Sequence, residues 1–457
     1  MLVNGPPDDP TGEVTDLLQH LIRNACVNDG TVASGHEDRS VDVLGSYLSP
    51  ASSGLDLEVY EPEPGRSSLV ARIEGTDPTA PTLLLMGHTD VVPANPDGWE
   101  RDPFGGELVD GVVWGRGAVD MLNLTASMAV ATRHLAERGW RPAGTLVYLA
   151  VADEEALGEH GAGWLVDHER DHVAADYVIT ESGGIPLATP AGVRLPVIVG
   201  EKGSYWVRLT VSGTPGHASQ PLRTDNALVK AAEVVTRIAS YRPRAVIHDT
   251  WRQFVEGMAY PDEIGRLMLD GEQLYELCQS LPLGLARQAH ACTHTTFAPT
   301  VVHGGTKTNV IPDRVELEVD IRTLPGQTGP EVRALLLDAI GEDLAPSVQI
   351  SAASDDPSSS SATGTPLWEA IGRVTERMVP GSETIPFLTV GATDARFFRR
   401  LGATAYGFGL FSSQMDFESY GTMFHGDNER IDQESLRLST ELWKTLAVDF
   451  LGTGSGA

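Results

Sequence analysis

Apolar runs alternate with helical stretches in the first part of the chain. The runs at 82–88, 144–155 and 175–184 are short and strand-like, and each contains or reaches a histidine or acidic residues near its end. Apolar residues at helical spacing predict helices at 16–25 and 123–138. Short apolar strands that alternate with helices are typical of a buried, largely parallel α/β sheet.

From about Gly200 the pattern changes. Four strands and two helices follow in the order strand, helix, strand, strand, helix, strand: 204–213, 226–241, 295–302, 314–322, 330–341 and 347–354. This is the order of a ferredoxin-like domain. The stretch 243–294 does not fit that order and is predicted to be a helical insertion, whereas the Ser-rich stretch 355–366 is predicted to be a linker.

These patterns predict two domains in a chain of 457 residues, which is longer than one typical domain. Residues 1–199 and 356–457 would form one domain in two segments. Residues 200–355 would form a second domain that is inserted into the first.

The composition argues against several classes of partner and site. The 63 acidic and 33 basic residues give a formal net charge of −30, and so acidic a surface repels nucleic acid and anionic membranes. Three cysteines without a Cys-x-x-Cys pair argue against a disulfide framework and a thiolate zinc site. The polar, Pro-rich N-terminus predicts no signal peptide, and no apolar run is long enough to span a membrane. We therefore expect a soluble, cytoplasmic protein.

Two candidate metal ligands lie in short motifs that contain glycine. His88 lies in GHTD, two residues before Asp90, and residues at this spacing on a strand share a face, so Asp90 could orient the imidazole ring. Asp120 lies in GRGAVDM, where Gly115 and Gly117 permit a tight turn. Taken singly, a structural histidine and an ordinary loop acid are the alternative interpretations.

Further candidates follow the other two apolar runs and lie near the C-terminus. Asp153, Glu154 and Glu155 come directly after an apolar strand, and three adjacent acids repel one another unless cations compensate them. Glu181 follows YVIT, and His425 lies in FHGDNE. A solvated turn is the alternative interpretation of the three acids.

Together these residues form a mixed nitrogen and oxygen ligand set, which suits zinc and also cobalt or manganese. Two metals that share one carboxylate need about five ligating residues. The chain supplies that number: His88, Asp120, Glu155, Glu181 and His425. We find no nucleophile-elbow, P-loop or dinucleotide-binding motif.

Seven motifs between about residues 80 and 440 resemble those of the co-catalytic zinc peptidases and deacylases, peptidase family M20. That family includes aminoacylase, acetylornithine deacetylase, succinyl-diaminopimelate desuccinylase and glutamate carboxypeptidase. The motifs are GHTDVVP, WGRGAVDM, DEE, PGHAS, TNVIP, GATDAR and FHGDNE. The resemblance implies a zinc-peptidase-like catalytic domain, with a mostly parallel sheet between helices, and an inserted ferredoxin-like lid or dimerisation domain.

The resemblance also implies roles for the candidate ligands. His88 and Glu181 would hold one metal and Glu155 and His425 the other, with Asp120 bridging the two. Glu154 would be the general base, and Asp90 would lie behind His88. The peptide bond between Asp120 and Met121 would be cis.

Outside the ligand set, the resemblance assigns five residues to the substrate. His217 of PGHAS would polarise the scissile carbonyl, and Asn309 and Arg322 would bind the substrate's carboxylate. Thr393 and Asp394 of GATDAR would line the pocket. Without the resemblance, His217 is a surface histidine and Arg322 forms an ordinary ion pair within a sheet.

The chain departs from the family pattern in two places. An arginine follows the last lid strand of the glutamate carboxypeptidase, but 351–361 contains none, which disfavours glutamate as the released group. The 243–294 segment departs from the compact members and could cover a dimer interface on the lid.

We therefore expect a metal-dependent hydrolase that cleaves the amide bond of N-acyl amino acids or short peptides beside a free carboxylate. The alternatives are a dipeptidase or a dedicated biosynthetic deacylase, and a metal-bearing binding protein without turnover. The intact Glu154 argues against the last. A homodimer is expected, in which His217 acts in its own chain or in its partner's site.

Overall fold

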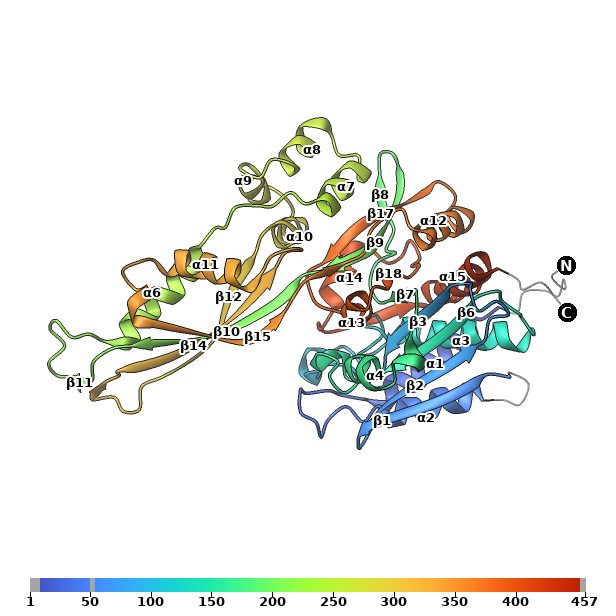
Figure 1. Cartoon of the computed structure of the whole chain (residues 1–457), viewed down its shortest axis with the longest axis horizontal. Coiled ribbons are helices and arrows are strands. Elements are labelled where there is room, and N and C mark those ends of the chain that lie inside the picture. The colour runs from blue at the N-terminus through green and yellow to red at the C-terminus, as the bar shows by residue number, and fades with distance from the viewer. Residues whose placement is uncertain (1–8, 50–53, 453–457) are drawn as a thin grey trace.

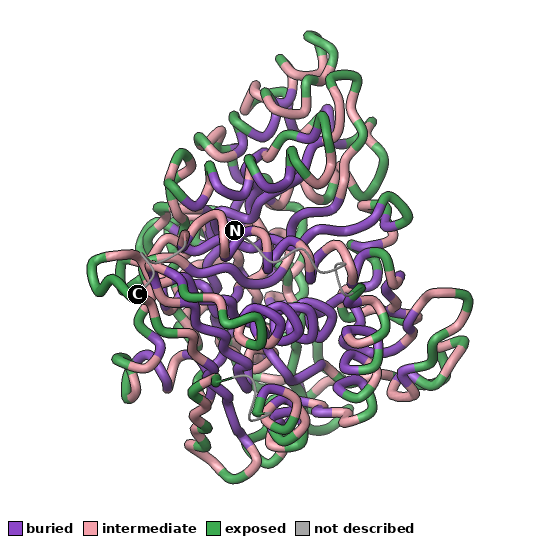
Figure 2. Tube along the Cα trace, turned by 90° about the vertical axis from the view of Figure 1, so that its right-hand side faces the viewer, coloured by how far each residue is buried: buried purple, intermediate pink, exposed green. Residues whose placement is uncertain are grey.

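The computed structural model describes residues 9–49 and 54–452. Figure 1 shows two bodies: a larger one that carries both ends of the chain, and a smaller one joined to it by the long ribbon of β9 and β10. In the larger body, buried strands and helices fill the centre and exposed loops surround them (Figure 2).

The larger body is built on a ten-stranded sheet. Along the main path the order is β1 (Asp56–Glu63), β2 (Arg66–Ile73), β6 (Thr145–Val151), β3 (Thr82–His88), β7 (Tyr177–Thr180), β18 (Thr404–Gly407), β9 (Gly192–Glu201) and β16 (Ser359–Ser360). Two strands pair with β9 beside this path: β8 (Leu187–Thr189) and β17 (Ser382–Thr389). The central strands β6, β3, β7 and β18 run parallel, as the apolar pattern predicts.

Helices cover both faces of this sheet because its central strands are apolar on both sides. On β3, Leu83 and Leu85 belong to one buried cluster, and Leu84 and Met86 belong to the other. The first cluster is covered by α1 (Thr11–Asn24), α2 (Asp38–Leu48), α3 (Leu122–Glu137), α12 (Pro366–Met378) and α15 (Gln433–Leu451). The second is covered by α4 (Ala162–His168), α5 (Arg170–Val173) and α13 (Ala395–Arg400).

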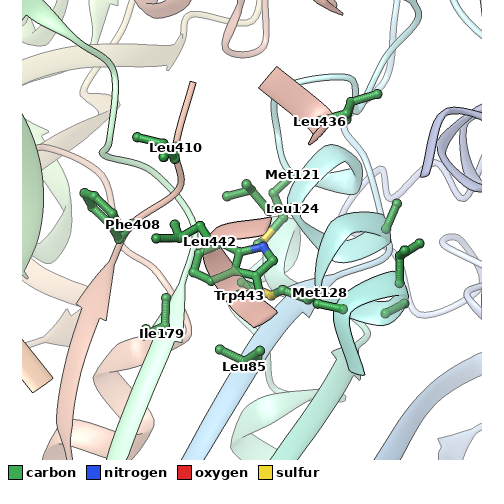
Figure 3. Packing of buried hydrophobic residues seen from close by; sticks show 14 of the residues in the cluster. Leu85, Met121, Leu124, Met128, Ile179, Phe408, Leu410, Leu436, Leu442 and Trp443 are labelled. Atoms are coloured by element: carbon green, nitrogen blue, oxygen red, sulfur yellow. The ribbon is translucent and has the colours of Figure 1, made fainter. Parts of the chain in front are cut away.

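Trp443 on α15 lies at the centre of the first cluster. Figure 3 shows its ring among Met128, Leu124 and Leu442. The indole N–H donates to the hydroxyl of Ser127 on α3 over 2.9 Å, so the buried polar atom of the ring is satisfied. This contact fixes the C-terminal helix to α3, which begins directly after the Asp120 loop.

The smaller body has the predicted ferredoxin-like order. Its elements are β10 (Gly203–Ser212), α6 (Ala227–Ser240), β12 (Thr296–Gly304), β14 (Arg314–Thr323), α11 (Gly329–Ile340) and β15 (Val348–Asp356). The antiparallel sheet has the strand order β12-β14-β10-β15. Residues of β14 alternate between buried and less buried, since only one face of the sheet packs on α6 and α11.

The 243–294 segment contains four helices: α7 (Asp249–Gly257), α8 (Asp262–Met268), α9 (Leu274–Cys278) and α10 (Leu283–Thr293). Their apolar side chains pack against the ten-stranded sheet, where the ring of Phe254 lies 4.7 Å from that of Phe387 on β17. We call the smaller body the lid. The segment leaves the outer part of β12, one of the two edge strands of the lid, exposed at Val301 and Val302.

The prediction of a linker at 355–366 is wrong in part. Strand β15 continues to Asp356, and Ser359 and Ser360 form β16, which pairs with β9. The backbone of this polar stretch pairs at the edge of the ten-stranded sheet, and hydrophobic periodicity gives no signal for such pairing.

The remaining elements are short. A small sheet contains β4 (Glu107–Val109), β5 (Val112–Trp114) and β19 (Arg430–Asp432), and a two-stranded sheet at the lid's tip contains β11 (Gly216–His217) and β13 (Val310–Ile311). The others are α14 (Phe417–Met423) and the 3₁₀ helices η1 (Pro96–Gly98), η2 (Glu154–Ala156) and η3 (Ala345–Ser347).

Lys202 occupies the first crossing between the two bodies, and only 1% of it is exposed. Its ammonium group donates to the backbone carbonyls of Ala291 and His294, each over 2.8 Å, at the C-terminal end of α10. Burial lowers the pKa of Lys202 to about 7, from 10.5. At pH values between these two pKa values, Lys202 is protonated in the unfolded chain and neutral in the folded chain. The free energy of unfolding therefore rises with pH in this range.

We predict that this pH dependence depends on Lys202. The difference in the free energy of unfolding between wild type and Lys202→Met should change by about 2 kcal/mol in favour of wild type when the pH is raised from about 7.5 to about 9.5. Urea unfolding followed by tryptophan fluorescence at both pH values measures this difference. Lys307→Met, at an exposed lid position, is the control. Equal pH dependence in wild type and Lys202→Met would contradict the prediction.

Candidate active site

Three parallel strands bring the first candidate ligands to one edge of the catalytic sheet. His88 is the last residue of β3, Glu154 and Glu155 lie in η2 after β6, and Glu181 follows β7. Since β6, β3 and β7 are neighbours and run parallel, their carboxyl ends meet.

His88 is buried and faces Asp120. Its Nε2 lies 3.2 Å from Asp120 Oδ1. Its Nδ1 lies 2.9 Å from the backbone carbonyl oxygen of Asp90 and 3.6 Å from Asp90 Oδ1. The nearer partner is therefore the carbonyl group of Asp90 rather than its carboxylate. An Nδ1–H that donates there leaves Nε2 free to act as a ligand.

Asp120 lies between two histidines. The Nε2 of His425 lies 3.3 Å from Asp120 Oδ2 and 3.1 Å from Glu155 Oε2. Hydrogen bonds to Asp120 and Glu155 raise the pKa of His425 to about 10. The two oxygens of Asp120 thus face different histidines, which is the arrangement that a bridging carboxylate requires. The peptide bond from Asp120 to Met121 is cis.

Two groups of side chains have the spacing of metal ligands among the described residues. One contains His88, Asp120 and Glu155, and the other contains His88, Glu154 and Glu181. Within each group the ligand atoms lie within 4.8 Å of one another. Glu155 Oε1 is buried and has no hydrogen-bond partner in the described chain, so this oxygen is free to bind a cation.

The cluster concentrates negative charge in a buried place. Burial raises the pKa of Glu154, Glu155 and Glu181, and nearby acids raise each further: Glu181 acts on Glu154, and Asp120 acts on Glu155 and Glu181. So many buried carboxylates are costly unless they are protonated or cations compensate them.

A buried ion network lies behind the three acids. Arg66 of β2 pairs with Glu37 over 2.9 Å and with Asp153 over 2.5 Å. The amide of Asn28 donates to Asp90 over 2.9 Å and to Asp153 over 3.2 Å. Sequence reasoning missed Glu37, Asn28 and Arg66. For Arg66 the sequence offers one signal: a basic residue at the start of an apolar strand.

Glu429 was also missed, although it ends the FHGDNE motif. It is fully buried and accepts hydrogen bonds from three backbone N–H groups of the loop that leads to Asp120. An acid four residues after His425 is the signal that the sequence offered.

The structure does not bring His217 and Asn309 to this cluster. His217 lies on β11, at the end of the lid farthest from the catalytic body (Figure 1). It is exposed, and its Nδ1 lies 2.7 Å from the hydroxyl of Ser219. The carbonyl of Asn309 accepts from the backbone N–H of Ala218, so Asn309 and His217 are neighbours at the lid's tip.

Arg322 lies at the other end of the lid, near the crossing. Its guanidinium pairs with both oxygens of Asp320, over 2.8 and 3.1 Å, and donates to the hydroxyl of Ser204 over 2.9 Å. Arg322 therefore forms an ion pair within the sheet, which is the alternative to a role in substrate binding. Its side chain is partly exposed.

Thr393 and Asp394 lie just before α13. The backbone N–H and hydroxyl of Thr393 donate to Glu201, over 2.6 and 2.8 Å. Asp394 is buried, and neither of its carboxylate oxygens has a hydrogen-bond partner in the described chain. Burial raises the pKa of Asp394 to about 7, and the nearby guanidinium of Arg396, 3.8 Å away, opposes this shift.

The mostly parallel sheet, the inserted lid and the carboxylate–histidine cluster at the strand ends define the class of the protein: a hydrolase with an α/β body and a separate lid. The match to Peptidase family M20/M25/M40 covers residues 84–449. The chain belongs to this family, and the predicted resemblance is confirmed.

Relatives agree with this assignment. N-fatty-acyl-amino acid synthase/hydrolase PM20D1 of Xenopus tropicalis is 28% identical over 90% of this chain and 82% of its own length. Human aminoacylase-1 is 29% identical over 78% of each chain. The fold resembles that of an M20 family metallo-carboxypeptidase, Sso-CP2 from Sulfolobus solfataricus, with a TM-score of 0.70, 19% identity and coverage of 96% and 99% of the two chains. The protein is thus a hydrolase, as predicted.

Two other features bear on the sequence predictions. All three cysteines are buried and unpaired. Across residues 9–49 and 54–452, the helices include none with the length and apolar character needed to cross a membrane.

Proposed function

We propose that the protein hydrolyses the amide bond of N-acyl amino acids beside their free carboxylate, with two zinc ions in the cluster. The position of Asp120 between His88 and His425, beside Glu155, carries this proposal. The same ligands also suit cobalt and manganese, since the donors are nitrogen and oxygen atoms only.

The residues present fit such a metal pair. Five side chains would hold it: His88, Asp120, Glu155, Glu181 and His425. The unpaired Glu155 Oε1 and the mutual repulsion of buried acids support cation binding. When bound, two divalent ions supply Lewis acidity and make water acidic enough to lose a proton near neutral pH.

The chain's own groups would perform the proton transfers. Glu154 would take the proton of the attacking water on its carboxylate and deliver it to the leaving nitrogen. Thr393 and Asp394 would line the space beside Glu154, and Asp90 would hold the His88 ring through its backbone carbonyl. His217 would donate to the oxygen of the scissile carbonyl, and Asn309 and Arg322 would bind the carboxylate.

The relatives' names favour an acyl amino acid as the substrate. Both PM20D1 and aminoacylase-1 are named for acyl amino acid chemistry, and they align over more than three quarters of this chain. A dipeptidase or a dedicated biosynthetic deacylase is the second candidate, because the same carboxylate contacts suit a short peptide. A cytoplasmic location stays a prediction, consistent with three unpaired cysteines.

We further propose a homodimer in which His217 acts in the partner's site. The exposed edge of β12, with Val301 and Val302, offers backbone groups and apolar side chains to a second lid. An antiparallel pairing of two such edges would project each lid's tip toward the other catalytic body. The exposure of His217 and its position at the tip support this arrangement.

We predict that Glu154→Gln retains two metal equivalents but loses turnover at least about a hundredfold, because the amide cannot accept the proton. Elemental analysis and kinetics on an acetylated amino acid panel test this. Glu159→Gln, at an exposed position on the same loop, should behave as wild type. Turnover of Glu154→Gln within tenfold of wild type would show that another group is the base.

We predict that amidation of the substrate's carboxylate abolishes binding, and that Arg322→Met raises KM about tenfold to a hundredfold through loss of charge-assisted hydrogen bonds. Arg314→Met, at the exposed start of the same strand, is the matched control. Equal kcat/KM for free and amidated substrates would overturn the assignment of the carboxylate pocket.

We predict that mixing Glu154→Gln with His217→Ala under conditions of subunit exchange restores about a quarter of wild-type activity, since random exchange makes half the dimers mixed and each has one working site. Mixing Glu154→Gln with Asp120→Asn is the control and should restore none. Exchange confirmed by native mass spectrometry without recovered activity would rule out the shared site.

A further inference from the structure

Glu429 joins two segments that are distant in the sequence. It lies directly before β19, which begins at Arg430 and pairs with β5, the strand that precedes the Asp120 loop. The backbone carbonyl of Glu429 accepts from the N–H of Gly115, so the pairing continues into the loop. The side chain then enters the loop and is 0% exposed.

Each carboxylate oxygen of Glu429 accepts two hydrogen bonds. Oε1 accepts from the backbone N–H groups of Val119, over 2.7 Å, and Asp120, over 2.9 Å. Oε2 accepts from the backbone N–H of Gly117, over 3.0 Å, and from the guanidinium of Arg116, over 2.9 Å. We call these four donors the Glu429 cradle.

The loop depends on this carboxylate because it lies between β5 and α3 without regular structure of its own. Its buried N–H groups would otherwise lack acceptors, at a cost comparable to a lost hydrogen bond for each. Arg116, 2% exposed, compensates the charge of Glu429. The loop conformation, and with it the position of Asp120, is therefore tied to the Glu429 side chain.

The other end of the connection is His425, four residues before Glu429. His425 and Asp120 are the pair whose side chains lie 3.3 Å apart in the cluster. Glu429 thus fixes the backbone that carries Asp120 from within the segment that carries His425. It contacts no reacting atom.

We infer that Glu429 is a positioning residue that sets Asp120 and His425 at the separation needed to bind metal. The inference rests on the proposed two-metal function. Replacement of a group that orients metal ligands typically alters metal affinity or activity 10–100-fold, and we expect an effect of this size at Glu429.

Glu429→Gln tests this with little change in size. Either orientation of the amide places its NH₂ group against two donors of the cradle, so two hydrogen bonds are lost. We expect calorimetric titration of metal-free protein with zinc to show affinity weakened about 10–100-fold. With saturating zinc, kcat should fall while KM stays within about threefold of wild type. Glu418→Gln, exposed on α14 in the same segment, should match wild type in every measurement.

Arg116→Lys provides a second route if Glu429→Gln does not fold. It retains the positive charge but loses the guanidinium geometry beside Oε2, so a smaller loss of zinc affinity in the same direction is expected. If Glu429→Gln folds and has wild-type zinc affinity and kcat, the role of Glu429 is overturned but the proposed function is not. A rise in KM at unchanged kcat has the same meaning. Wild-type protein that binds no metal would overturn the proposed function together with the role of Glu429.

Discussion

The rest of the structure depends on repulsion among carboxylates that the parallel sheet forces together. Strands β6, β3 and β7 must be apolar to be buried on both faces, and their ends must meet at one edge because they run parallel. Acids placed after these strands therefore converge in a region with little water. Burial raises the pKa of Glu154 and Glu181, which is the electrostatic cost of that convergence. Divalent cations bound at this edge would compensate the charge of these acids.

Arginines of the scaffold compensate several acids that lie behind the cluster. Arg66 pairs with Glu37 and Asp153, and Arg116 pairs with Glu429, in each case behind the candidate ligands. The acids that face inward have histidines, or each other, as neighbours. This division separates two functions of a buried acid: those paired with arginine fix the backbone, and those left without a cation of the protein remain available to a ligand.

Sequence reasoning was strongest where a signal is local. The strand that ends at His88 was predicted with its observed bounds, and the ferredoxin-like order follows from the succession of runs. It was weakest where pairing is non-local: nothing near Glu429 indicates that its carboxylate accepts from a loop more than 300 residues away. The same holds for 355–366, whose polar residues give no periodicity although their backbone pairs with β9. The partner of the His88 ring also differs from the prediction, since the backbone carbonyl of Asp90 lies nearer to His88 Nδ1 than the Asp90 carboxylate does.

The crossings between the two bodies bear on how the lid can act. Glu201 in the first crossing accepts from Thr393 and pairs with Arg399, and Asp356 in the second pairs with Arg396 and Arg400. Both crossings are thus tied to one loop and helix, α13, which directly follows Thr393 and Asp394. The lid's near end is thus held by ion pairs, of which the Glu201–Arg399 pair is buried, so any motion of the lid about this end would displace His217 more than Arg322. In the proposed homodimer, an anchored near end would keep Arg322 beside its own cluster while the tip carries His217 to the second copy.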